Sequence, residues 1–146
     1  MRLDHLVQIY DLRYDRAHIE NVQKATSQTK DFGLISEHGL FGSEEWWKAV
    51  ADGTIPTYTI EGVISRVFMS GHNDYEEFEV DDGTKKTCWT RQTSEIPGSS
   101  LSRSQMADLY KEGKSVRITY VKQKFKKAIP GLGKESECVL GIWVTP

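Results

Sequence analysis

The sequence predicts a mainly β (α+β) fold, a small five-stranded β-barrel of the oligonucleotide/oligosaccharide-binding (OB) type. Five segments after residue 57 alternate apolar and polar residues, as half-buried strands do. One segment with helical spacing separates the third from the fourth, so the order is β-β-β-α-β-β, as in an OB-like barrel. The strands are expected at Tyr58–Phe68, Tyr75–Asp82, Lys86–Gln92, Val116–Phe125 and Cys138–Thr145, and the helix at Ser102–Lys111.

Turn and bend signals agree with this order. Gly62 inside the first strand marks a bend or a close backbone approach, which the tilted strands of a barrel require. Asp82-Gly83 is a hairpin signal between the second and third strands. Ser102 or Ser104 can cap the helix. An open five-stranded sheet with a packed helix is the alternative architecture.

Residues 1–57 are expected to form an N-terminal helical extension packed on the barrel domain of residues 58–146. The first 15 residues fit helical and strand spacing equally, so periodicity leaves their structure open. From Asp15, a capping residue, the sequence has good helix-forming composition. The apolar stripe of that helix is thin, so the helix is either lightly docked or a partner surface.

A second short helix in the extension carries a tryptophan pair. Ser43 can cap the helix, and Gly53 can end it. At least one of the adjacent rings of Trp46 and Trp47 should be buried against the barrel. The pair and the thin stripe together suggest a homodimer that uses the N-terminal segment. Trp89, inside a predicted strand, is expected in the core.

Composition indicates a globular protein. Hydrophobic residues make up 38% of the 146 residues, too many for a disordered chain. The apolar stretches are too short to span a membrane, and the N-terminus lacks a secretory signal pattern. We therefore expect a cytoplasmic protein without membrane association. The net charge of −2 argues against a general nucleic-acid binder.

The sequence motifs predict no metal and no cofactor. The four histidines lack ligand spacing, and Cys88 and Cys138 form no CxxC pair. The acids around the second strand alternate between its faces, so a solvated face is favoured over a cation site. An acid-based enzyme site near Asp74, Glu76 and His72 is the catalytic alternative.

The strongest functional signal is a lysine-rich hairpin with interleaved aromatic residues. No acid lies between Lys114 and Lys127. Cations and aromatic rings suit single-stranded nucleic acid, because its phosphates attract cations and its bases stack on aromatic rings. Glu77 and Glu79 would repel such a nucleic-acid strand. We therefore favour the alternative that the lysines keep the hairpin solvated and form ion pairs with these two acids. The candidate ligand-binding residues are Tyr120, Lys122, Lys124, Phe125, Lys126, Lys127, Lys134 and His72.

The sequence thus predicts a non-catalytic binding or adaptor module. A protein partner or self-association is favoured, and single-stranded nucleic acid is possible. The small enzyme is the alternative. Barrels of this type host many unrelated functions, so the fold does not identify the ligand.

Overall fold

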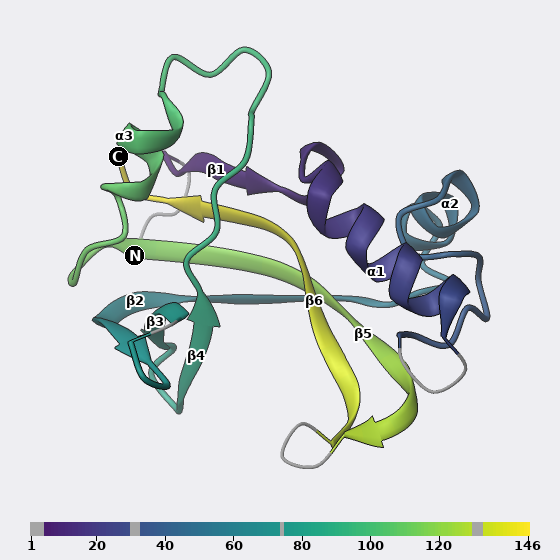
Figure 1. The fold of residues 1–146 in the computed structure, drawn as a ribbon. Helices are drawn as coiled ribbons and strands as arrows, with labels where there is room; N and C mark the ends of the chain where they lie inside the picture. The colour runs from purple at the N-terminus through teal and green to yellow at the C-terminus, as the bar shows by residue number, and fades with distance from the viewer. Residues whose placement is uncertain (1–4, 30–32, 74, 130–132) are drawn as a thin grey trace.

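The protein forms one antiparallel sheet of six strands in the order β1-β6-β5-β2-β3-β4 (Figure 1). The computed structural model describes residues 5–29, 33–73, 75–129 and 133–146. The predicted mainly β fold is confirmed. The strands are β1 Val7–Asp11, β2 Thr57–Ser70, β3 Tyr75–Asp81, β4 Lys86–Thr90, β5 Ser115–Ile129 and β6 Gly133–Val144.

The prediction of a closed five-stranded barrel is wrong, because the sheet stays open. The five expected strands are β6, β5, β2, β3 and β4 in their order across the sheet, so closure would require β6 to pair with β4. These two strands do not pair. A sixth strand, β1, instead adds to β6 along Gly141–Val144 and takes up part of the edge that closure would need.

The chain that leaves β4 draws one end of the open sheet together. Its Ser94 N–H donates to the carbonyl of Ile9 on β1 at 3.1 Å. The Ser94 hydroxyl oxygen accepts from the Asp11 N–H at 2.8 Å, and Ser94 is only 2% exposed. A single buried serine therefore links β1 to the segment that follows β4, whereas no such bridge joins β4 to β6 at the other end among the described residues.

Helix α1, Arg16–Gln28, starts directly after β1 and the short 3-10 turn Leu12–Tyr14. Asp15 caps α1 as predicted, since one carboxylate oxygen accepts from the His18 N–H at 3.3 Å. Its second oxygen accepts from the Tyr10 hydroxyl on β1 at 2.8 Å. Burial first, and then this carboxylate, raise the pKa of Tyr10. The Tyr10–Asp15 bond thus ties the start of α1 to β1.

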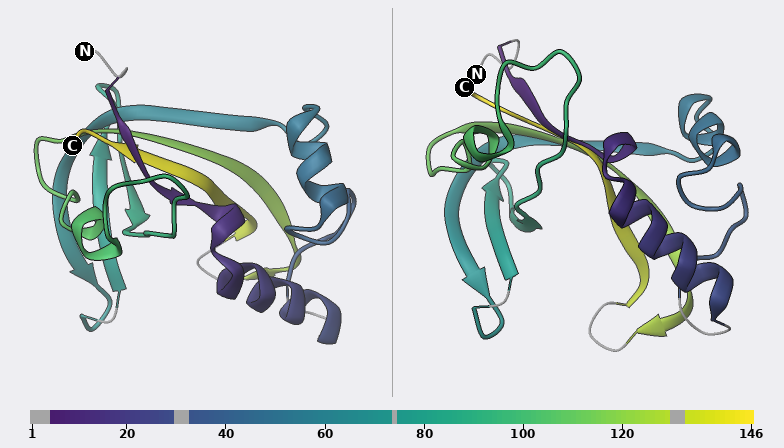
Figure 2. Two further views of the ribbon diagram at one scale, coloured as in Figure 1. Left: turned by 90° about the horizontal axis from the view of Figure 1, so that it is seen from above. Right: turned by 45° about the horizontal axis from the view of Figure 1, so that its top comes forward.

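The other two helices also begin at the predicted caps. The Ser43 hydroxyl accepts from the Trp46 N–H and starts α2, Glu44–Ala51. Ser102 forms a capping box with Gln105 and starts α3, Arg103–Ala107. Figure 2 shows α1 and α2 at one end of the sheet, with α3 and its preceding loop at the other.

The core extends over both ends of the long twisted sheet. Trp46 of α2 has no exposed surface and donates from its indole N–H to the Gln123 side chain on β5 at 3.1 Å. The prediction that one tryptophan of the pair is buried against the sheet is confirmed. Trp89 is also buried, as expected. The largest fully buried side chains are Trp46, Tyr10, Phe78, Ile9, Leu12, Ile19, Ile64, Met106, Ile118, Ile142, Val80 and Val116.

Pairing with β6 resolves the ambiguity of the N-terminal segment, where Val7–Asp11 is a strand. Residues on both sides of position 57 contribute to one core cluster, and the division into two domains there stays a prediction. In the described part of the chain, no helix is both long enough and apolar enough to span a bilayer.

A candidate binding cleft beside β4

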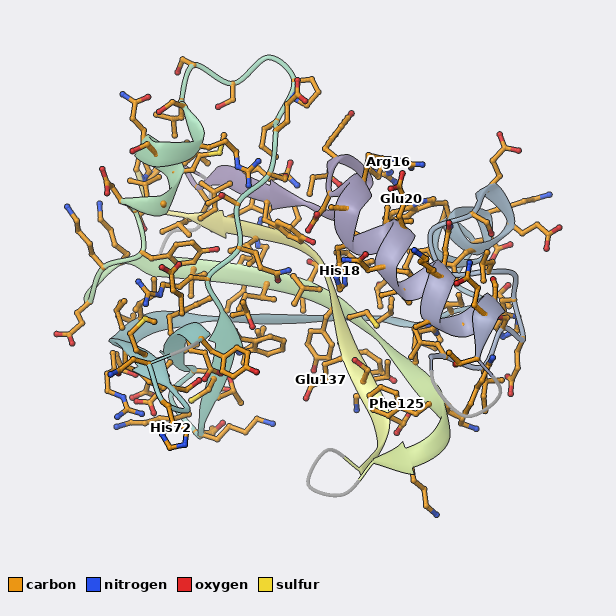
Figure 3. The ribbon with its side chains drawn as sticks, viewed as in Figure 1. Arg16, His18, Glu20, His72, Phe125 and Glu137 are labelled. Carbon is orange, nitrogen blue, oxygen red and sulfur yellow. The ribbon has the colours of Figure 1, made fainter. Side chains whose placement is uncertain are left out.

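A cleft of about 540 Å³ lies where the sheet fails to close. Its walls are the exposed side of β4, the hairpin of β5 and β6, and helix α1. Figure 3 shows His18 projecting from α1 next to β6, with Glu137 beside β6 and Phe125 on the neighbouring strand. The lining residues are His18, Asn21, Val22, Ala25, Gly33, Leu34, Glu77, Cys88, Trp89, Thr90, Gln92, Phe125, Ser136, Glu137, Cys138 and Val139.

The cleft runs along strand edges and not over one face of the sheet. Successive side chains of a strand point to opposite faces. Cys88, Trp89 and Thr90 are consecutive, yet all three line the cleft. The consecutive residues Ser136–Val139 of β6 also line the cleft, and they lie outside the stretch of β6 that pairs with β1. The cleft therefore separates the open edge of β4 from an open part of the edge of β6.

Two hydrogen bonds reveal which backbone groups of β4 face this cleft. At the ends of the β3–β4 ladder, the Arg91 N–H donates to the Glu76 carbonyl at 3.0 Å, and the Asp82 N–H donates to the Lys85 carbonyl at 3.1 Å. Hydrogen-bonded pairs alternate along an antiparallel ladder. The residues that bond to β3 are therefore Thr87 and Trp89. The backbone N–H and C=O groups of Cys88 and Thr90 point away from β3.

These outward backbone groups have no partner among the described residues. Within the described ranges, strand β4 pairs only with β3, and no turn or loop hydrogen bond reaches Cys88 or Thr90. An unpaired strand edge can accept another strand, and proteins usually blunt or cover it. No described residue covers this edge and no bulge interrupts it, but the edge is recessed beside α1 in the cleft.

The cleft combines apolar surface with negative charge. Val22, Phe125 and Val139 supply apolar contacts. Its described lining contains two carboxylates, those of Glu77 and Glu137, and no lysine or arginine. A ligand that fits this surface carries cations next to apolar groups.

The two thiols of the cleft differ in accessibility. Cys88 is exposed, whereas Cys138 is buried. Burial raises the pKa of Cys138 to about 11. Burial also raises the pKa of Cys88, with smaller contributions from the carboxylates of Glu79 and Glu77. Both thiols are protonated at neutral pH, and neither has the lowered pKa of a reactive nucleophile. No cluster of three or more His, Cys, Asp or Glu side chains that could hold a metal occurs among the described residues.

The aromatic residues of the predicted hairpin site lie near the cleft. Phe125 lines it. The Tyr120 ring packs between Trp89 and Tyr58, at centroid distances of 5.2 and 5.5 Å. Tyr120 is half-buried, and its ring stacks on that of Tyr58 at an interplanar angle of 25°.

The lysines of that predicted site differ in their surroundings, and two of them, Lys122 and Lys124, line one small hollow. Lys126 donates from its ammonium group to the carbonyls of Thr26 and Thr29 at the end of α1, where a cation is favourable. The Lys122 ammonium lies 4.7 Å from the centre of the Tyr58 ring. Lys124 and Lys134 are exposed.

Acidic residues oppose the hairpin lysines, but these acids differ from the expected ones. Lys122 and Lys124 lie across from Glu137 and Glu135 on β6, not from Glu77 and Glu79. Glu79 instead contacts Arg66, with 3.8 Å between the charged atoms. The hairpin thus carries alternating charge instead of a continuous basic surface.

The other predicted site residues lie apart from the cleft or outside the residues that the structure describes. His72 is exposed in the turn between β2 and β3. Asp74 and the side chain of Lys127 lie outside the described residues. The ligand-binding set as a whole stays a prediction.

Sequence reasoning missed the α1 wall and the open edge of β4. The available signal was the thin apolar stripe of α1, which indicated either light docking or a partner surface. In the structure Ile19 and Thr26 are buried, while His18, Asn21 and Val22 line the cleft. The edge of β4 had no sequence signal, because closure depends on which strands pair.

A recessed, open strand edge with acidic and apolar lining, and without a described metal cluster, is typical of a surface that binds another protein. Comparison with protein-family models agrees, because it places the chain among immunity proteins, a class that neutralises toxins by binding them. The matching model covers residues 6–145, and the chain belongs to the RhsI2 immunity protein family. A search of curated proteins found no match.

Family membership corrects the function inferred from the sequence. A generic adaptor or nucleic-acid-binding module and the small acid-based enzyme are both wrong as readings of this chain, because the matched family consists of toxin-neutralising proteins. The broader expectation of a protein partner is supported, as is the expectation that the chain is not an enzyme.

Proposed function

We propose that this protein binds its cognate Rhs toxin in the cytoplasm and neutralises it, and that the cleft beside β4 receives the toxin. The observation that carries this proposal is the family match over residues 6–145. The cleft supports it, because its volume of about 540 Å³ and its open strand edge give a protein segment both room and unpaired backbone groups.

A direct binding experiment tests the proposed function. Titration of the purified chain with the toxin domain of its cognate Rhs protein, followed by calorimetry, should give a saturable complex. Co-expression should restore growth to cells that produce the toxin domain. A chain that neither binds the toxin domain nor restores growth would contradict the proposal.

Charge in the cleft makes a specific prediction for this complex. Changing both Glu77 and Glu137 to glutamine should weaken toxin binding by about tenfold, because a cationic partner loses two attractive contacts in a partly desolvated site. The matched control is Glu112→Gln, an exposed residue that does not line the cleft. The double variant should also reduce the salt dependence of the affinity. Unchanged affinity would show that the acids do not face the toxin.

A chemical block at Cys88 tests the location directly. This thiol is exposed in the cleft, whereas Cys138 is buried, so a bulky maleimide should modify Cys88 in the folded protein. Modification should abolish toxin binding through steric exclusion. Cys88→Ala should bind normally and should resist both labelling and the block. A fully labelled protein with normal affinity would place the toxin elsewhere.

A further inference from the structure

We infer that an extended segment of the toxin pairs with the open edge of β4 and adds a strand to the sheet. This inference rests on the proposed function and specifies its binding mode. The backbone groups of Cys88 and Thr90 make the contact. The toxin segment that pairs with them carries lysine or arginine side chains.

The backbone geometry provides the first argument. The ladder bonds of Arg91 and Asp82 require Cys88 and Thr90 to present their N–H and C=O groups away from β3. Both residues line the cleft, so these groups face a space large enough for a peptide. An added strand uses these donors and acceptors in alternation, which gives affinity without a dedicated side-chain pocket.

The surroundings of the edge provide the second argument, because they select what can enter. Strand β4 contains no proline and one charged residue, Lys86, at its start. It therefore lacks most of the devices that blunt exposed edges. Helix α1 and strand β6 flank it instead, since His18 and Glu137 line the same cleft. A single extended segment can reach the edge there more easily than a whole sheet can.

Charge complementarity favours a toxin segment over a second copy of this chain. Glu77 and Glu137 line the cleft, and no lysine or arginine does so among the described residues. Two copies joined through β4 would bring two acidic clefts together, and like charges at short distance repel. A segment with cationic side chains gains attraction from the same two carboxylates.

The test compares two substitutions at one position. Thr90→Pro removes the outward N–H and obstructs an added strand, but it breaks no bond to β3, because that N–H faces the cleft. Thr90→Ala also removes the threonine side chain, but it keeps the backbone N–H. We expect the proline variant to bind the toxin domain at least tenfold more weakly than the alanine variant, while both melt cooperatively. Equal affinities of the two folded variants would overturn the inference.

Hydrogen exchange of the unmodified protein keeps the inference testable if the proline variant fails to fold. In the free chain the amides of Cys88 and Thr90 should exchange quickly, and the Trp89 amide, bonded to β3, should exchange slowly. Toxin binding should slow Cys88 and Thr90 at least tenfold. A complex that forms without this protection would overturn the strand-pairing mode and leave the proposed function intact, whereas absence of a complex would overturn the proposed function.

Measurements on the free protein test whether a second copy of this chain occupies the edge of β4. If Cys88 and Thr90 are already protected and light scattering gives a dimer mass, a second copy occupies the edge and the inference is overturned. A monomer with rapidly exchanging edge amides supports it.

Discussion

Replacing Trp46 with alanine should lower the free energy of unfolding by about 3–5 kcal/mol, the range typical of large aromatic residues removed from a core. The indole has no exposed surface and packs at 4.8 Å from the rings of both Phe41 and Trp47. It also holds α2 against β5 through the Gln123 side chain. Removing it leaves a cavity between α2, β5 and the loop that carries Phe41, and urea denaturation measures the loss.

Trp47 supplies the matched control for this experiment. It is the same residue type at the next position, but it is half-buried and stacks under the Arg13 guanidinium at 4.7 Å. Trp47→Ala should cost less than about 2 kcal/mol, because a partly exposed cation–π contact and partial burial contribute less than full burial. Equal losses for the two variants would contradict the assignment of Trp46 as the anchor of α2.

Gly62→Ala should cost about 3 kcal/mol, because a methyl group at this position meets the backbone of the neighbouring strand. A Cβ atom on Gly62 would lie 2.3 Å from the Asp81 carbonyl oxygen and 2.9 Å from its carbon. Neither atom can move aside as a flexible side chain can, so β2 and β3 must separate. The sequence predicted a bend or a close backbone approach from a glycine inside a strand, and the structure shows the close approach.

The control for the glycine experiment is Gly53→Ala. That glycine has a φ of +85°, but a Cβ there would meet nothing within 4 Å. Its substitution should cost about 1–2 kcal/mol, the penalty for an L-residue in the left-handed region. If Gly62→Ala is no more destabilising than this control in the same urea titration, the close approach of β2 and β3 does not constrain position 62.

The inferred strand pairing gives the open sheet a functional meaning. A fully closed barrel would use the backbone groups of Cys88 and Thr90 internally and leave none for a partner. Here Ser94, in the segment that follows β4, holds this segment to β1 with hydrogen bonds to Ile9 and Asp11. The other end stays open along the cleft. The chain thus combines a fixed sheet with one edge that remains available.

The sequence by itself determined the local elements of this protein. Five strands and three capped helices lie where alternation and capping residues predicted them, because burial on one face and helix capping involve nearby residues. The caps at Asp15, Ser43 and Ser102 each satisfy backbone groups within three positions along the chain. These features need no knowledge of how distant strands meet.

Only the tertiary structure decided the pairing of the strands and the position of the cleft. Val7–Asp11 fits helix and strand spacing alike, and its pairing with β6 across more than a hundred positions makes it a strand. Lys126 belongs to a lysine-rich run, but its ammonium group holds the end of α1. The sequence of β4 likewise does not show that the edge of this strand lacks a neighbouring strand. Periodicity describes which face of an element is buried, whereas the partner at its edge depends on contacts between residues far apart in the chain.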